Sequence, residues 1–205
     1  MEKEFELNEC LEKIYSDTYL TDMVREYDEN KTKEKLIDVY KVLSYRDIFA
    51  AYTIVFKNKK LEKKLKKESS LSIEEITNEE NCVREILKAQ NYCGDENDYL
   101  ICVFTDPTKI DFETMPVNSM ELTDLKKLWE PYSLDEKCDG IIINPKDECL
   151  MIDKCIVELI LSGNYDGINE ILTLLEKVEN ANDGDEIIRL LKEYLGNFDE
   201  DLESI

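Results

Sequence analysis

Apolar residues recur at steps of three and four positions between Phe5 and Tyr27, which is the spacing of one face of an α-helix. The pattern predicts one or two amphipathic helices near the start of the chain. A polar cluster at 28–30 interrupts the pattern, and Thr32 can begin a further helix. We therefore predict an N-terminal helical segment over residues 1–35 that leads into the next helix.

Two continuous apolar runs predict buried strands in the first half of the chain. The run at 48–56 fits either a buried strand or a core helix, because a continuous run shows no period. Its latter half is β-branched and aromatic and favours a strand, whereas Ala50 and Ala51 favour a helix leading into it. The run at 99–104 predicts a strand more clearly, because a Thr-Asp-Pro turn at 105–107 ends it.

A segment that runs from a glycine to a proline gives the sharpest strand signal. Three isoleucines lie between Gly140 and Pro145, and isoleucine fits a buried, pleated strand well. The two end residues confine the extended segment to about five residues. A short polar stretch separates it from another apolar run at 149–152, and this spacing predicts a hairpin.

Helical spacing predicts further helices, and together with the strands they make a mixed α+β fold. We expect helices at 57–68, 81–90, 119–129 with Ser119 as its cap, 153–162, 165–178 and 185–195. The strands then form a small mixed central sheet of four or five strands flanked by helices. This core spans 36–162, and an acidic C-terminal helical pair with its tail, at 163–205, packs on it.

The chain is strongly acidic. Its 205 residues include 48 aspartates and glutamates against 26 lysines and arginines, which gives a net charge of −22. We expect no nucleic-acid partner, because binding to phosphates depends on lysine and arginine, and we interpret the lysine-rich run at 57–68 as a solvated helical face. The acidic surface either keeps the protein soluble through self-repulsion or meets a basic protein partner.

Neither a membrane protein nor an exported protein is indicated. No run of about 18 apolar residues occurs, and Glu2, Lys3 and Glu4 are unlike the start of a signal peptide. The seven cysteines form no Cys-x-x-Cys pair, so we expect reduced thiols. The sequence thus predicts a cytoplasmic protein with no membrane partner, and it leaves the oligomeric state open.

The order of three motifs resembles the SseB N-terminal-domain family. The motifs are the strand and turn at 99–107, the leucine-bearing helix at 120–128, and the Gly-Ile-x-Ile-Asn-Pro strand at 140–145. The resemblance covers about residues 36–162. It implies the α+β fold of a bacterial family that has no settled biochemical role and no agreed catalytic residues. In place of a second family domain, this chain carries the acidic helical pair.

The chain offers little for catalysis. It contains no histidine, and this absence removes the commonest general base and nearly all catalytic zinc arrangements. Cys102 is predicted to fill the core, and no glycine-rich phosphate loop occurs. The run at 182–186 resembles half of a calcium loop but fits a turn and a helix cap better. We predict a protein that is not an enzyme, with no cofactor and no metal.

Four polar residues are candidates for a binding site, namely Asn144, Asp139, Asp147 and Glu148. The side chain of Asn144 either closes the turn after its strand or projects from the strand end into a groove. The leading hypothesis is a protein-interaction module, with an acidic inhibitor or immunity-type protein that covers a basic nuclease or toxin as one subtype. The alternative is a small-molecule sensor or an enzyme with a pocket beside the end of the Asn144 strand.

Overall fold

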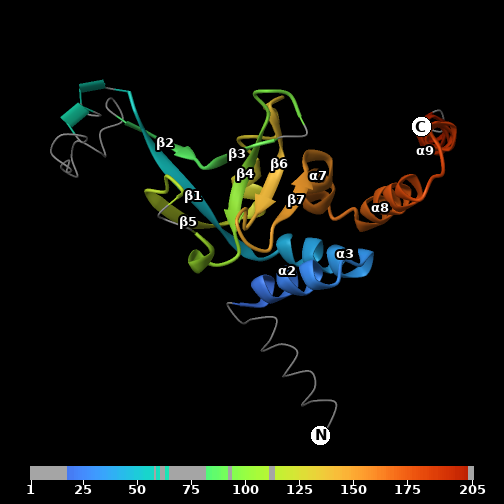
Figure 1. Ribbon diagram of the computed structural model, residues 1–205, viewed down its shortest axis with the longest axis horizontal. Coiled ribbons are helices and arrows are strands. Elements are labelled where there is room, and N and C mark those ends of the chain that lie inside the picture. The colour runs from blue at the N-terminus through green and yellow to red at the C-terminus, as the bar shows by residue number, and fades with distance from the viewer. Residues whose placement is uncertain are drawn as a thin grey trace, which may run out of the picture.

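The computed structural model describes residues 18–57, 59–60, 63–64, 82–91, 94–110 and 114–202, with side chains up to residue 194. The expected helix over the first 17 residues and most of the expected helix at 57–68 lie outside the described residues. Figure 1 shows a central sheet with helices beside it and a final pair of helices at one end of the molecule.

The described part of the chain begins with two helices, continues through the strands with two short helical elements between them, and ends in three helices. The helices are α2 (Tyr19–Glu29), α3 (Lys33–Leu43), the 3₁₀ turn η1 (Pro107–Lys109), α6 (Leu125–Trp129), α7 (Lys154–Ser162), α8 (Tyr165–Glu179) and α9 (Gly184–Leu202). The strands are β1 (Asp47–Phe56), β2 (Cys82–Ile86), β3 (Lys88–Gln90), β4 (Tyr99–Phe104), β5 (Ser119–Asp124), β6 (Cys138–Ile143) and β7 (Leu150–Asp153). The predicted α+β class with a C-terminal helical pair is confirmed.

The sheet is mixed and its centre is a parallel pair. The strands follow the order β2-β1-β4-β6-β7, with β5 on β1 and β3 on β4. Strands β4 and β6 run parallel, while β6 and β7 form the expected antiparallel hairpin. Every residue of β4 is buried, and so is every residue of β6 except Asp139. The two strands that the sequence marks most clearly therefore form the interior of the sheet.

The two faces of the sheet bury two different apolar clusters. The larger cluster receives side chains from α2, α3, α6, α7 and α8, including Val24, Val39, Trp129, Val157 and Ile168. The smaller cluster on the opposite face receives none from a described helix, and its buried members are Ala51, Leu87, Leu100, Cys102, Phe104, Ile110 and Ile142. We call this second side the helix-free face.

The prediction of a helix at 81–90 is wrong, because this segment forms β2 and β3. Strand β2 pairs with β1 in register, from Tyr52 opposite Ile86 to Phe56 opposite Cys82. Ile86 lies in the larger cluster and Leu87 in the smaller one. Successive side chains of a strand point to opposite faces, so the three-to-four spacing of apolar residues here was coincidental. Pairing with β1 decides the conformation.

Two other local predictions also need correction. The expected helix at 119–129 is a strand for its first half, and the cap of α6 is Asp124, whose Oδ1 accepts a hydrogen bond from Lys127 N at 2.9 Å. The expected helix at Ala50 and Ala51 is part of β1. Strand β5, together with β2 and β3, raises the strand count from the four or five predicted to seven among the described residues.

The C-terminal helical pair is anchored at its start. Helix α7 ends at Gly163, whose φ of 71° is the left-handed conformation that suits a helix end. Ile168 of α8 is fully buried, and α8 packs on α3 and α7. Helix α9 packs on α8, and none of its described side chains is buried. The far part of the pair is therefore a projecting, solvated element, as Figure 1 shows.

We predict that Gly140→Ala is far more destabilising than alanine at either of two other glycines. Gly140 has a φ of 146°, and a Cβ there would lie 2.1 Å from the Ile152 backbone oxygen. Strain and overlap together should lower the free energy of unfolding by at least about 3 kcal/mol, measured in urea.

The matched controls are Gly163→Ala and Gly184→Ala, where an added Cβ meets nothing within 4 Å. Gly163 has positive φ, so we expect a loss of about 1 kcal/mol there, and at Gly184 a change of less than about 1 kcal/mol. Equal losses at the three positions would contradict the close approach of β6 and β7.

Candidate functional site

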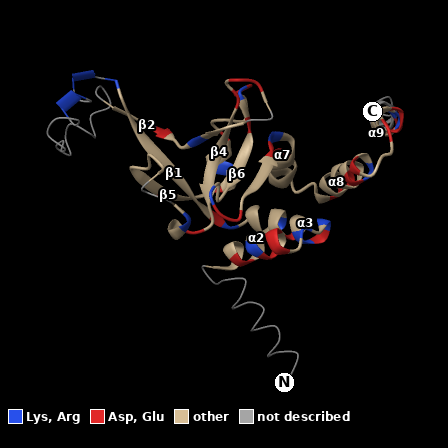
Figure 2. Cartoon of the chain, viewed as in Figure 1, with Lys and Arg blue, Asp and Glu red and all other residues tan. Residues whose placement is uncertain are grey.

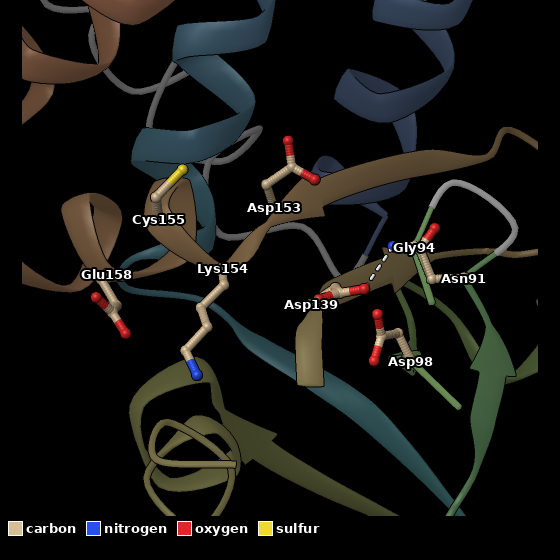
Figure 3. A pocket seen from close by; sticks show the side chains of 8 residues that line it. All are labelled: Asn91, Gly94, Asp98, Asp139, Asp153, Lys154, Cys155 and Glu158. Carbon is tan, nitrogen blue, oxygen red and sulfur yellow. Dashed lines mark hydrogen bonds between the residues drawn. The ribbon is translucent and has the colours of Figure 1, made fainter. Parts of the chain in front are cut away.

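A pocket with a cavity volume of about 620 Å³ opens where β6 begins and where β7 leads into α7. Its lining residues are Asn91, Gly94, Asp98, Asp139, Asp153, Lys154, Cys155 and Glu158. Figure 3 shows Asn91, Asp98 and Asp139 close together, with Lys154, Cys155 and Glu158 on α7 across from them. We call this the acidic pocket.

An irregularity in the central strand pair helps to place Asp139 in the pocket. Tyr99 of β4 pairs with Cys138 of β6, but the next residue, Leu100, pairs with Gly140. Asp139 is therefore an extra residue in β6, and such bulges redirect a side chain. Its Oδ2 accepts a hydrogen bond from Asn91 Nδ2 at 2.7 Å, which fixes the carboxylate beside β3.

The described lining of the acidic pocket carries four carboxylates against one ammonium group, that of Lys154. Lys154 Nζ donates a hydrogen bond to the Asp135 backbone oxygen at 3.0 Å. Asp153 and Glu158 are exposed, so their charges face solvent. A concave surface with an excess of like charge concentrates its field and attracts ions of the opposite sign. The arrangement favours a cationic group.

Asn144 lies at the other end of β6 and is fully buried, with 0% of its surface exposed. Its Oδ1 accepts from Thr105 N at 3.1 Å, and its Nδ2 donates to Thr105 Oγ1 at 3.1 Å. Thr21 Oγ1 of α2 donates to the same Thr105 hydroxyl at 2.8 Å. The side chain therefore joins the ends of β4 and β6 to α2, and in this structure it does not project into a groove.

Asp147 and Glu148 lie near Asn144 and share one cation. Lys109 Nζ is 2.5 Å from Asp147 Oδ2 and 2.6 Å from Glu148 Oε2. These bonds hold the pKa of Lys109 above its usual value and the pKa of Asp147 below its usual value. The three side chains fasten η1 to the β6–β7 loop, so the two carboxylates are already satisfied within the chain.

Of the four residues expected to form a binding site, only Asp139 lines the acidic pocket. The structure places it at the opposite end of β6 from the other three. Asn91, Asp98, Asp153 and Glu158 were not predicted. Asn91 and Asp98 escaped notice because the segment before them, 81–90, was expected to form a helix. Asp153 was expected only as the first residue of the helix at 153–162, and in the structure it is the N-cap of α7 without a side-chain cap bond.

The described cysteines are free thiols. Cys102 is buried, and burial raises its pKa to about 12. Cys149 and Cys155 are exposed, and partial desolvation also raises the pKa of each. Among the residues that the structure describes, no group of three or more histidine, cysteine or acidic residues could hold a metal ion.

Comparison with known proteins adds no assignment. No family model, no curated protein and no solved structure matches this chain. In the described part of the chain, no helix is both long and apolar enough to cross a membrane. Figure 2 shows acidic and basic residues interspersed on α2, α3 and α8.

We predict that Asn144→Ala lowers the free energy of unfolding by about 2–4 kcal/mol. The substitution leaves the buried Thr105 amide without its side-chain acceptor, and alanine is strained at the φ of 47° that Asn144 adopts. Urea titration measures the loss. Asn180→Ala, which removes an exposed side chain from the end of α8, should cost less than about 1 kcal/mol. Equal effects would contradict a structural role for Asn144.

We predict that the described cysteines separate into two classes of reactivity at pH 8. Iodoacetamide should modify Cys149 and Cys155 more than about 100-fold faster than Cys102, which reacts only when the core opens. The exposed pair should still react more slowly than a free cysteine peptide, because their pKa values are raised. Mass spectrometry of digested peptides gives the rates, and fast labelling of Cys102 would refute the buried placement of β4.

Proposed function

We propose that this protein is a non-catalytic cytoplasmic interaction module that binds a basic partner protein through the acidic pocket. The observation that supports the proposal is the lining of that pocket, with four carboxylates against one lysine. A lysine or arginine side chain of a partner can enter a cavity of this size. Its positive charge would balance the excess negative charge of the pocket.

The net charge of the whole chain also favours a basic partner. A net charge of −22 attracts a basic protein over a distance of about one Debye length before any contact forms. Complementary charge mainly accelerates association and selects the partner, while an ion pair formed in the pocket adds a specific contact. An inhibitor or immunity-type protein that covers the cationic site of a nuclease or toxin is one subtype of this function.

A small-molecule sensor is the second candidate, and the volume of the pocket supports it. Ligand sites commonly have volumes of about 300–1,000 Å³, and the acidic pocket, which is open to solvent, falls within this range. The sequence placed the pocket of such a sensor beside Asn144, but this residue is buried. The candidate site is therefore the acidic pocket at the opposite end of β6, and its ligand would be a small cation. Similarity to the SseB N-terminal-domain family remains a prediction that is compatible with either function.

We predict that an arginine-rich peptide binds at the acidic pocket. In a titration followed by amide NMR, the signals of Asn91, Gly94 and Asp139 should shift, whereas a glutamate-rich peptide of equal length should leave them unchanged. Affinity should fall at least about tenfold between 50 and 500 mM salt, because salt screens the attraction. Shifts produced by free arginine alone, at comparable affinity, would favour the small-molecule sensor.

A pair of matched variants separates the pocket from general acidity. The triple variant Asp139→Asn, Asp153→Asn, Glu158→Gln should weaken binding about tenfold or more. The control Asp166→Asn, Asp183→Asn, Glu193→Gln removes the same charge from α8, α9 and their junction and should change affinity less than about threefold. Equal weakening by the two variants would contradict a specific site in the pocket.

A further inference from the structure

Strand β5 forms an edge of the sheet. It pairs with β1 over six consecutive residues without a register shift. Among the described residues, β1 is its only partner strand, and Figure 1 places β5 at the outer edge beyond β1. The outer side of such a strand presents unpaired backbone N–H and C=O groups, to which another extended chain can bond.

Two large apolar side chains of β5 remain exposed on the helix-free face. Met120 is 39% exposed and Leu122 is 55% exposed. Met120 lies opposite Ala51, and Leu122 lies opposite Phe49, which packs against the smaller apolar cluster. The exposed pair thus extends an apolar surface from the interior of the sheet to its edge. A strand added to β5 would cover both side chains.

The edge carries two acidic residues but lacks several other features that usually prevent strand addition. Proteins protect edges with lysine, proline, bulges or very short strands. Ser119 to Asp124 contains neither lysine nor proline, and its register with β1 is regular. A regular, partly apolar edge of this kind is unusual unless something covers it.

We propose that β5 is the docking edge for an extended segment of a basic partner protein, in which apolar and basic residues alternate. Alternate residues of the added strand would lie beside Met120 and Leu122 on the helix-free face. The residues between them would lie on the other side of the sheet, beside Glu121. This inference rests on the proposed function only for the basic character of the partner.

Charge favours a basic partner segment over a second copy of the chain at the β5 edge. The charged residues of β5 are Glu121 and Asp124, both acidic. Asp124 already pairs with Lys127 Nζ at 2.9 Å, so Glu121 is the charge that a basic residue of an added strand would meet, and opposite charges across a strand pair stabilise it. Arg84 Nη2 lies 3.2 Å from Glu121 Oε2, but both side chains are about half exposed, so this pair is weak and can be shared. Two copies would each carry a net charge of −22 and would repel each other.

The test uses a short capped peptide of alternating valine and lysine, labelled for fluorescence anisotropy and added to the full chain. The peptide should bind, and hydrogen exchange at the β5 amides should slow at least about tenfold, because main-chain bonds form there. A peptide of the same composition in which the apolar and basic residues do not alternate should bind at least about tenfold more weakly. Absence of binding, or unchanged exchange at β5, would overturn the inference.

Variants locate the site and show that the protein is still folded. Met120→Thr with Leu122→Thr retains strand-forming residues and should weaken binding at least about tenfold. The control Leu175→Gln with Leu191→Gln removes similarly exposed side chains from α8 and α9 and should leave binding unchanged. Circular dichroism melts verify that the variants are folded. If the β5 amides of the protein alone are protected from hydrogen exchange at high protein concentration, a second copy covers the edge and the inference is overturned.

The acidic-pocket triple variant separates this inference from the proposed function. If it abolishes binding of the alternating peptide while the β5 variant does not, the pocket is the binding site and the β5 inference fails. If only the β5 variant weakens binding of the alternating peptide, the β5 inference holds and the acidic pocket is not the site that binds a basic partner. Weakening by both variants supports two contacts with one partner.

Discussion

The parallel pairing of β4 and β6 is the constraint on which the rest of this structure depends. Both strands are buried on two faces, so their side chains are almost entirely apolar and their backbone groups must bond to neighbouring strands. At Gly140 the backbone of β7 approaches so closely that a Cβ would overlap the Ile152 oxygen. A larger residue at this position would therefore disturb the pairing of β6 with β7 beside the central pair.

The two ends of this strand pair have opposite characters. At the carboxyl end, Asn144, Thr105 and Thr21 form a buried set of hydrogen bonds that ties the sheet to α2. At the amino end, the bulge at Asp139 opens the ladder and places a carboxylate in the acidic pocket. The structure thus has a closed, structural end and an open, charged end. The proposed function uses the open end.

The sequence predicted the parts of the fold that local chemistry determines. The strand between Gly140 and Pro145, the hairpin after it, the Thr32 cap of α3 and the end of α7 at Gly163 follow from residue types that have few alternatives. The segments at 82–90 and 119–124 could not be assigned in this way. Their apolar spacing fits a helix, and only the pairing of each segment with β1 makes it a strand.

The candidate site was less predictable than the fold, for a related reason. Asp139 was recognised because it adjoins the glycine, but its pocket partners come from residues between β3 and β4, from the end of β7 and from α7, which meet only in three dimensions. Asn144 was recognised as unusual, yet the sequence left open whether its side chain faces a groove or the protein. Burial against Thr105 depends on the neighbouring strand end.

Native-state hydrogen exchange tests the central claim most directly, because it measures the free energy of opening residue by residue. If the β4–β6 pair is the centre of the fold, the amides of Ile101, Cys102, Ile142 and Ile143 should exchange only by global unfolding, with the highest opening free energies in the chain. Helix α9, which has no buried side chain among those described, should exchange at much lower free energy. Exchange of the β4 and β6 amides at free energies as low as those of α9 would contradict the account.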